Sequence, residues 1–149
     1  MVLEYLDIKK IIIDSEAQDY RELLKQMLLC SALKEEETIL NSSIDQITKR
    51  DALMPTALGK GIAIPRLINE NIKQNEIIIA INAKGLPLQG IDDKQVKIAF
   101  LLLHSRNDNY AGLIASVLRL LNDDNLRDDL IQAKNAADVL KIIQRWEQG

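Results

Sequence analysis

Residues 50–66 read RDALMPTALGKGIAIPR, and this stretch decides how the rest of the chain is interpreted. Met54-Pro55 ends a preceding helix, because proline disfavours a helical residue before it. Gly59 and Gly61 mark a turn, and Ile62–Pro65 predicts a short apolar strand closed by proline. A helix, a glycine-containing turn and a strand therefore follow one another here.

The residues before this stretch predict one strand and two helices. Ile8–Ile13 is rich in β-branched residues and predicts a strand. Ser15 fits the start of a capping box with Gln18, and apolar residues then recur at helical spacing as far as Leu28. A second helix is expected from about Glu36 to Asp51, with acidic residues at its start, where they suit the helix dipole.

The residues after the stretch predict two strands and three helices. Glu76–Ile81 and Val96–Leu103 are the strands, and the second is almost continuously apolar, as in a central strand covered on both faces. Asp108 or Asn109 is a candidate cap for the first of three amphipathic helices that fill the last third. Helices on both sides of a mixed sheet would bury all of these apolar faces.

The composition is that of an ordinary globular domain. The 149 residues are enough for one core, and 47% are hydrophobic and 28% charged. The net charge of −3 indicates no strongly basic surface for nucleic acid, although a local basic patch is compatible with it. The single cysteine, Cys30, is interpreted as a buried structural thiol, so we expect a cytoplasmic protein. No apolar run approaches the roughly 20 residues that span a bilayer.

The stretch at 50–66 resembles the signature of the type-2 enzyme IIA family of the phosphotransferase system, which serves fructose, mannitol and a nitrogen-related branch. That signature has Arg-Glu, a few residues, Thr-Gly-Ile-Gly, one variable residue and then Gly-Ile-Ala-Ile-Pro-His. Here Asp51 replaces the glutamate, Ala57 a glycine and Arg66 the histidine, while the spacing is kept. A glycine pair alone would be weak evidence, but the combination is specific.

The resemblance extends over nearly the whole chain. Ile11–Leu28 is similar to the family's first strand and helix, residues 91–96 to its Asp-Gly-x-Pro-Val segment, and Tyr110–Leu121 to a helix that normally begins His-Leu. The resemblance implies an α/β fold of three layers, α/β/α, with a small mixed sheet flanked by helices. It also implies that residues 1–149 form a single domain.

The family's chemistry is phosphoryl transfer through a histidine, and this chain departs from it. The reaction needs a neutral imidazole nitrogen as nucleophile near neutral pH. Arg66 at the phosphoacceptor position stays protonated and has no available lone pair. Tyr110 falls where many members have a second histidine, and its usual pKa of about 10 makes it a poor nucleophile. No catalytic residue is therefore assigned with confidence in the family's terms.

The single histidine, His104, leaves two readings open. It ends the apolar strand, and strand ends carry sites in α/β sheets, so it is a candidate displaced phosphoacceptor. The alternative, which we favour, is a strand-end histidine that only hydrogen-bonds nearby.

Three basic residues are candidates for an anion-binding pocket. Arg50 matches an arginine that the family places beside its phosphohistidine, and Lys60 and Arg66 would join it at the start of the helix near Tyr110. The alternative is three solvated or salt-bridged side chains with aspartate partners.

Two further features have simple structural explanations. Asp92-Asp93 lacks additional ligands for a metal and is interpreted as a solvated turn, so neither a metal nor a cofactor is expected. Trp146 is expected to pack the last helix onto the body of the domain.

Three functions remain in view. The first is a regulatory protein-binding module of the nitrogen-related branch that does not carry phosphate at Arg66. The second is a phosphotransfer subunit of fructose- or mannitol-type sugar uptake that uses another acceptor such as His104. The third is a module that binds phosphate or a phosphorylated metabolite. The expected partners are the phosphocarrier protein, other regulatory proteins of the system, or a second copy of the chain.

Overall fold

Two antiparallel strands form the centre of the computed structural model, which describes residues 1–53, 56–88, 90–106 and 110–149. They are β5 (Glu76–Ile81) and β6 (Ile98–His104), and Ile79 lies opposite Phe100. β1 (Ile11–Ile13) runs parallel to β5 at one edge. On the other edge β3 (Ile62–Ala63) and β4 (Arg66–Ile68) both run parallel to β6, and β2 (Ala57–Gly59) pairs with β3 in a short hairpin. The sheet is therefore mixed, as predicted.

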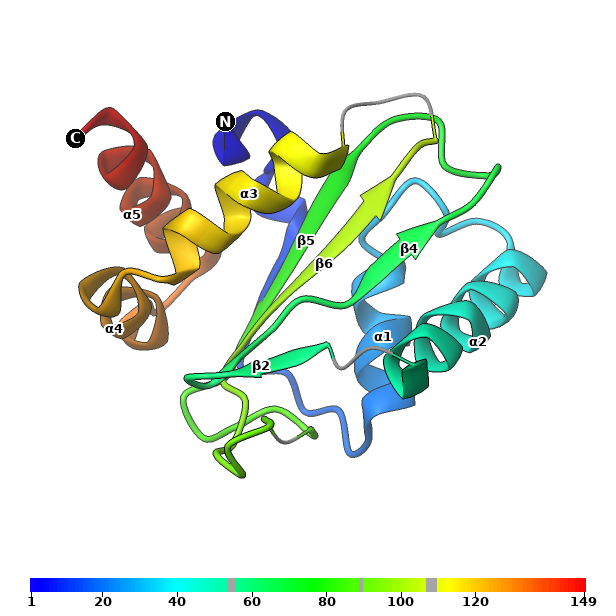
Figure 1. Cartoon of the computed structure of the whole chain (residues 1–149), viewed down its shortest axis with the longest axis horizontal. Helices are drawn as coiled ribbons and strands as arrows, with labels where there is room; N and C mark the ends of the chain where they lie inside the picture. Colours follow the sequence, from blue (N-terminus) through cyan, green and yellow to red (C-terminus); the bar gives the residue numbers. More distant parts are fainter. Residues whose placement is uncertain (54–55, 89, 107–109) are drawn as a thin grey trace.

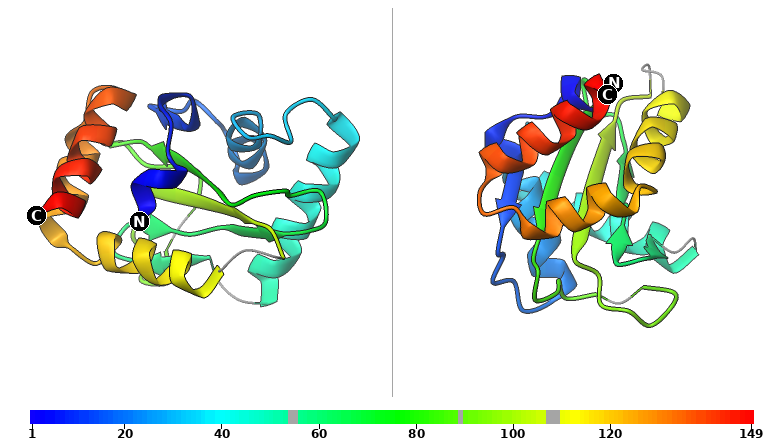
Figure 2. Two further views of the ribbon diagram at one scale, coloured as in Figure 1. Left: turned by 90° about the horizontal axis from the view of Figure 1, so that it is seen from above. Right: turned by 90° about the vertical axis from the view of Figure 1, so that its left-hand side faces the viewer.

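Helices cover both faces of this sheet (Figure 1). One face carries α1 (Tyr20–Leu28) and α2 (Glu37–Leu53). The other carries α3 (Tyr110–Leu121), α4 (Asp124–Gln132) and α5 (Ala136–Gln148), together with the short 3₁₀ turn Val2–Tyr5. Figure 2 shows these two helical layers on opposite sides of the strands. The three-layer α/β/α prediction is confirmed.

The alternation of side chains along β6 separates two cores. Phe100 and Leu102 belong to the core beneath α3, α4 and α5, whereas Leu101 and Leu103 belong to the core beneath α1 and α2. Successive side chains of a strand point to opposite faces, so a strand buried on both sides must be apolar throughout. This explains the continuous apolar run in the sequence. It also assigns His104, two residues beyond Leu102, to the α3 face.

The predicted strand at Ile62–Pro65 is shorter than expected and has a continuation. It comprises only Ile62–Ala63, and a second segment, Arg66–Ile68, follows Pro65 along the same edge of β6. Pro65 lacks an N–H, which restricts it to such interruptions in a ladder. Its carbonyl still accepts a hydrogen bond from the amide of Leu102.

Two predictions at the N-terminus were wrong. Ile8–Lys10 is a 3₁₀ turn, because the Asp7 side chain accepts a hydrogen bond from the Lys9 amide, and the strand begins at Ile11. The N-cap of α1 is Asp19 rather than Ser15. The Ser15 hydroxyl instead donates to Gln26 and accepts from the Ala17 amide.

Other predictions have mixed outcomes. The indole of Trp146 packs on the α3-side core and donates to Asp123, as expected of a residue that anchors the last helix. Cys30 follows α1 and is only partly buried. The helix end at Met54-Pro55 and the caps Asp108 and Asn109 lie outside the described residues. Among the described helices, none has the length and apolar character needed to cross a membrane.

Candidate functional site

The register between β4 and β6 brings Arg66 and His104 onto the same face of the sheet. Arg66 lies beside Leu102 and Ile68 lies beside His104. Residues two apart on a strand share a face, so both side chains project toward α3. The start of that helix supplies Tyr110.

Tyr110 contacts both of these residues. The Arg66 guanidinium donates from Nη1 to the Tyr110 hydroxyl oxygen at 2.9 Å. The Tyr110 ring stacks on the His104 imidazole, with centroids 3.5 Å apart and an interplanar angle of 22°. The resemblance expects histidines at positions 66 and 110. Here these positions hold Arg66 and Tyr110, which hydrogen-bond to each other beside His104.

His104 is buried and uncharged at neutral pH. Its relative exposure is 3%, and within the described chain neither ring nitrogen has a hydrogen-bond partner of good geometry. Burial, the largest cause, and the charges of Arg50 and Arg66 together lower the pKa of His104 to about 4, against the opposing effect of the Ser105 backbone. His104 is thus a buried strand-end side chain that stacks on Tyr110 and has the Ser105 backbone as a polar neighbour.

Arg50 lies near the end of α2 and approaches the same cluster from the sheet edge. Its charge acts on His104, and its Nε is buried without a hydrogen-bond partner in the described part of the chain. Neither Arg50 nor Arg66 forms an ion pair with a carboxylate of a described residue. Two cations and a neutral imidazole thus gather without a described counter-charge.

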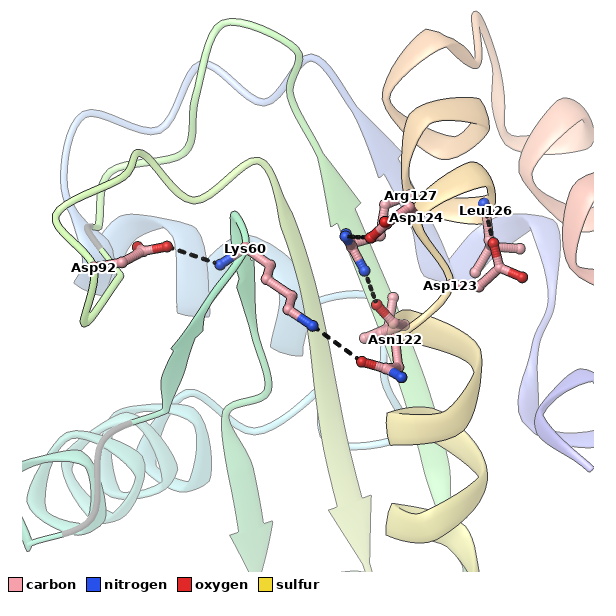
Figure 3. A network of polar contacts seen from close by, with 8 residues as sticks. Lys60, Asp92, Asn122, Asp123, Asp124, Leu126 and Arg127 are labelled. Atoms are coloured by element: carbon pink, nitrogen blue, oxygen red, sulfur yellow. Dashed lines mark hydrogen bonds and ion pairs between the residues drawn. The ribbon is translucent and has the colours of Figure 1, made fainter.

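The structure does not bring Lys60 to this cluster. Its ammonium donates to the side chain of Asn122, which follows the last residue of α3 (Figure 3). Arg66 instead bonds Tyr110, the first residue of α3. The α3 helix has 12 residues and is therefore about 18 Å long at 1.5 Å per residue, so Lys60 and Arg66 contact opposite ends of it. The predicted three-residue group of Arg50, Lys60 and Arg66 is corrected to Arg50 and Arg66.

Asp51 has a structural role next to Arg50. Its carboxylate accepts hydrogen bonds from the hydroxyls of Tyr20, at 2.7 Å, and Thr56. Burial first, and then the nearby Asp51 charge, raises the pKa of Tyr20, so the phenol remains a donor. Asp51 thereby ties α1 to the end of α2 and to the start of the motif turn, rather than pairing with a basic side chain.

Asp92 stabilises the loop that faces the β2–β3 turn. Its carboxylate accepts from the amides of Lys60 and Lys94, and these bonds, the Lys60 amide foremost, lower its pKa. This is the turn role expected for Asp92-Asp93. Among the described residues, no group of three or more histidine, cysteine, aspartate or glutamate side chains is placed to hold a metal ion.

Comparison with known proteins decides the family. The family described as "Phosphoenolpyruvate-dependent sugar phosphotransferase system, EIIA 2" matches residues 4–146. The chain belongs to this family. The EIIA 2 assignment agrees with the fold, in which Ile62–Ala63 and Arg66–Ile68 pair with β6.

Curated EIIA relatives have low sequence identity. The chain is 22% identical over 105 residues to the "PTS system fructose-specific EIIA component" of Haloferax volcanii, covering 69% of this chain and 68% of that protein. It is 27% identical over 123 residues to the "Nitrogen regulatory protein homolog" of Haemophilus influenzae, covering 76% and 75%. In longer relatives it spans only 16% or 12% of the protein.

A solved structure confirms the EIIA 2 fold. The nitrogen regulatory protein IIA-Ntr of Neisseria meningitidis superposes with a TM-score of 0.78 at 23% identity, covering 95% of this chain and 98% of that one. At this identity the likeness shows the fold alone.

The sequence of this EIIA 2 domain did not predict the stacking of His104 on Tyr110. Side chains alternate between the two faces of a strand, so His104 is expected on the same face of β6 as Leu102. The amphipathic helix that follows must return over that face. Together these signals place the two rings on one side of the sheet. The stacking itself could not be predicted, because the residues between His104 and Tyr110 carry no periodic pattern in the sequence.

Proposed function

We propose that this EIIA 2 domain does not carry phosphate at position 66 and acts as a regulatory protein-binding module of the nitrogen-related branch. The observation that carries the proposal is the hydrogen bond from Arg66 to Tyr110. A guanidinium that remains protonated offers no lone pair to phosphorus, and here its donors are already directed at a phenol.

Exposed apolar residues beside the motif support a role in protein contacts. Leu53, Leu58 and Ile91 are 85%, 41% and 68% exposed. They belong to segments that border a hollow of about 240 Å³, lined in part by Asp51, Ala57 and Ile91. Of the three, only Ile91 lines the hollow itself, and the other two are near it in sequence. Exposed apolar side chains of this kind are typical of protein-binding surfaces. The proposed occupant is the phosphocarrier protein or another regulatory protein of the system.

The regulatory assignment is tested by adding the phosphocarrier protein in its phosphorylated and unphosphorylated forms. The proposal expects saturable binding, with no increase in the intact mass of this chain under neutral or alkaline conditions. Stoichiometric phosphate on residues 59–66 would contradict it, as would a complete lack of binding to either form.

A second candidate function is phosphotransfer through His104. The observation in its favour is an uncharged imidazole, next to two arginines, whose nitrogens have no hydrogen-bond partner among the described residues. One ring nitrogen would form the new N–P bond as the N–P bond in the donor protein breaks, and the arginines would stabilise the transferring oxygens. Against it stand the 3% exposure of His104 and the Tyr110 ring stacked on its face. Phosphate that appears on this chain and is lost in His104→Ala would favour this candidate.

A third candidate is anion binding by Arg50 and Arg66. Both lack a described carboxylate partner, and Arg50 Nε is buried without a hydrogen-bond acceptor. A bound phosphate would supply that acceptor and a counter-charge. This candidate is compatible with the regulatory proposal, because an anion near the protein-binding surface could alter the affinity for a partner.

A further inference from the structure

The structure has a second basic region that the proposed function does not use. A hollow of about 500 Å³ lies between the β2–β3 turn, the loop before β6, and α4. Six of its lining residues carry the argument: Lys60, Lys94, Lys97, Arg127, Asp128 and Ile131. Four of these are cations and one is a carboxylate, in a chain whose net charge is −3. This hollow is therefore locally basic, although the chain as a whole carries a net negative charge.

The lysines of this hollow are not neutralised by described neighbours. Lys60 donates to the uncharged amide of Asn122 at 3.1 Å, and Lys94 and Lys97 form no ion pair with any described carboxylate. Asp92, on the same loop, accepts hydrogen bonds from the backbone amides of Lys60 and Lys94, and the Lys94 charge acts on its carboxylate without forming an ion pair. Three lysine ammonium groups thus line the hollow without a described ion-pair partner, against the single lining carboxylate of Asp128.

Arg127 is held in a fixed orientation at the α4 wall. Its guanidinium donates to the Leu121 carbonyl at 2.8 Å and pairs with Asp124 (Figure 3). A guanidinium that is already positioned loses less side-chain entropy when a ligand binds. Ile131, also on α4, gives this wall an apolar portion against which a carbon skeleton can pack.

Lys60 occupies a backbone conformation that rarely holds a lysine. Its φ is +56° and that of Gly61 is +76°, so both central residues of the β2–β3 hairpin are left-handed. Asparagine, aspartate and glycine are the usual residues at such positions, because other L-residues are strained there. From this strained position the Lys60 side chain extends toward the end of α3, where its ammonium donates to Asn122 (Figure 3).

We propose that this hollow binds a small organic phosphate that carries at least two negatively charged groups. Its volume falls within the range of small-molecule sites. Three lysines from two segments match two separate anionic groups better than one, while Arg127, already paired with Asp124, forms part of the α4 wall. The apolar contribution of Ile131 suits the carbon skeleton between the anionic groups. The site is separate from Arg66, because α3 spans the distance between Tyr110 and Asn122.

The test uses the full chain and backbone amide chemical shifts, titrated with inorganic pyrophosphate and with fructose 1,6-bisphosphate as probes. Saturable shifts are expected at Gly61, Lys94 to Lys97 and Arg127. Lys97→Gln should weaken the affinity about tenfold, and Lys94→Gln, at an exposed position, should weaken it in the same direction without affecting folding. Lys25→Gln, on the exposed side of α1 across the sheet, is the matched control and should bind as the wild type does.

Other outcomes would overturn the proposal. Shifts confined to residues near Arg50 and Arg66 would assign the anion to that cluster instead. Equal affinity in Lys94→Gln, Lys97→Gln and Lys25→Gln would show that general surface charge is responsible. A hexaglutamate peptide that binds the hollow more tightly than either phosphate would identify an acidic protein segment as its ligand. None of these results depends on whether position 66 carries phosphate, so this proposal and the regulatory one fail separately.

Discussion

Arg66 and Tyr110 are joined by a hydrogen bond of 2.9 Å between the guanidinium Nη1 and the phenolic oxygen. The bond connects the β4 edge of the sheet to the first residue of α3. It occupies the place where the family resemblance expects two imidazoles. The cluster keeps its positive charge but loses the nucleophile at position 66.

Arg66→His tests how much of the phosphotransfer site is retained. The new imidazole would lie beside Arg50 and would have a lone pair near neutral pH. We expect partial recovery of phosphate acceptance from the phosphorylated phosphocarrier protein, because Tyr110 still differs from the family pattern. The measurement is phosphate incorporation over time, with Arg66→Gln as the control without a nucleophile. If Arg66→His accepts no more phosphate than Arg66→Gln, the docking surface or the remaining site has also changed.

His104 should make stability depend on pH in the acidic range. Its folded pKa of about 4 lies below the ordinary value of 6.5, so the unfolded chain binds more protons between these values. Stability must therefore rise as pH increases from about 4 to 6.5, and this contribution is lost as pH falls through the same range. We expect about 3 kcal/mol from this group, because its pKa falls from 6.5 to about 4 on folding and one pKa unit corresponds to about 1.4 kcal/mol.

The only histidine gives a direct measurement of that titration. NMR of the His104 imidazole should show a midpoint near 4 in the folded protein. Urea unfolding at a series of pH values gives the free energy of unfolding as a function of pH. Between pH 4 and 6.5 this free energy should change less in His104→Phe than in the wild type. The substitution keeps an aromatic ring against Tyr110. A midpoint near 6.5 would mean that the ring is open to solvent and not stacked as described.

The Arg50 and Arg66 cluster should bind phosphate weakly. Each charge-assisted hydrogen bond contributes roughly 1.5–3 kcal/mol before the costs of ordering and desolvation. Millimolar to high-micromolar affinity, about −4 to −6 kcal/mol, is expected. Bound phosphate should also raise the pKa of His104, since it offsets the two positive charges that help to lower it.

The measurement is a phosphate titration at low ionic strength, followed by the shifts of amides near Arg66 and of the His104 ring. Arg66→Ala should abolish them, and added salt should weaken them if the cluster is open to solvent. Shifts that persist unchanged in Arg66→Ala would exclude the cluster as the phosphate site. Lys60→Gln should have little effect here, because its ammonium lies at the far end of α3.

The exposed apolar residues near the motif should carry partner binding. Leu58→Asp places a charge in that surface and is expected to weaken binding of the phosphocarrier protein at least fivefold, by loss of apolar burial. Leu118→Asp is the matched control, because Leu118 is 40% exposed and Leu58 is 41% exposed. Titration calorimetry measures both. Equal effects of the two substitutions would argue against this surface as the contact.

The fold was largely predictable because it depends on strong apolar patterns. The almost continuous apolar run within residues 98–104 predicted a strand covered on both faces. The helical spacing of apolar residues in the last third of the chain predicted α3, α4 and α5. Local hydrogen bonds explain the two wrong predictions at the N-terminus. Asp7 caps the 3₁₀ turn at Ile8–Lys10, where a strand was expected. Asp19, rather than Ser15, caps α1. Such competition among neighbouring polar residues is decided by backbone geometry that the sequence pattern does not contain.

The candidate site was only partly predictable. Arg50 and Arg66 follow from the resemblance, whereas the direction of the Lys60 side chain depends on two left-handed residues in a tight hairpin. A left-handed lysine is uncommon, so the sequence offered no reason to expect it. The stacking of Tyr110 on His104 likewise depends on how the chain returns after β6.

The central claim, that position 66 does not carry phosphate, is tested most directly by residue-mapped phosphorylation. The chain is incubated with phosphorylated phosphocarrier protein, kept at neutral or alkaline pH, and analysed by intact mass and by the mass of the peptide that contains residues 59–66. An unchanged mass of that peptide is predicted, in wild type and in His104→Ala alike. Stoichiometric, acid-labile phosphate on residues 59–66 of the wild-type chain would contradict the account.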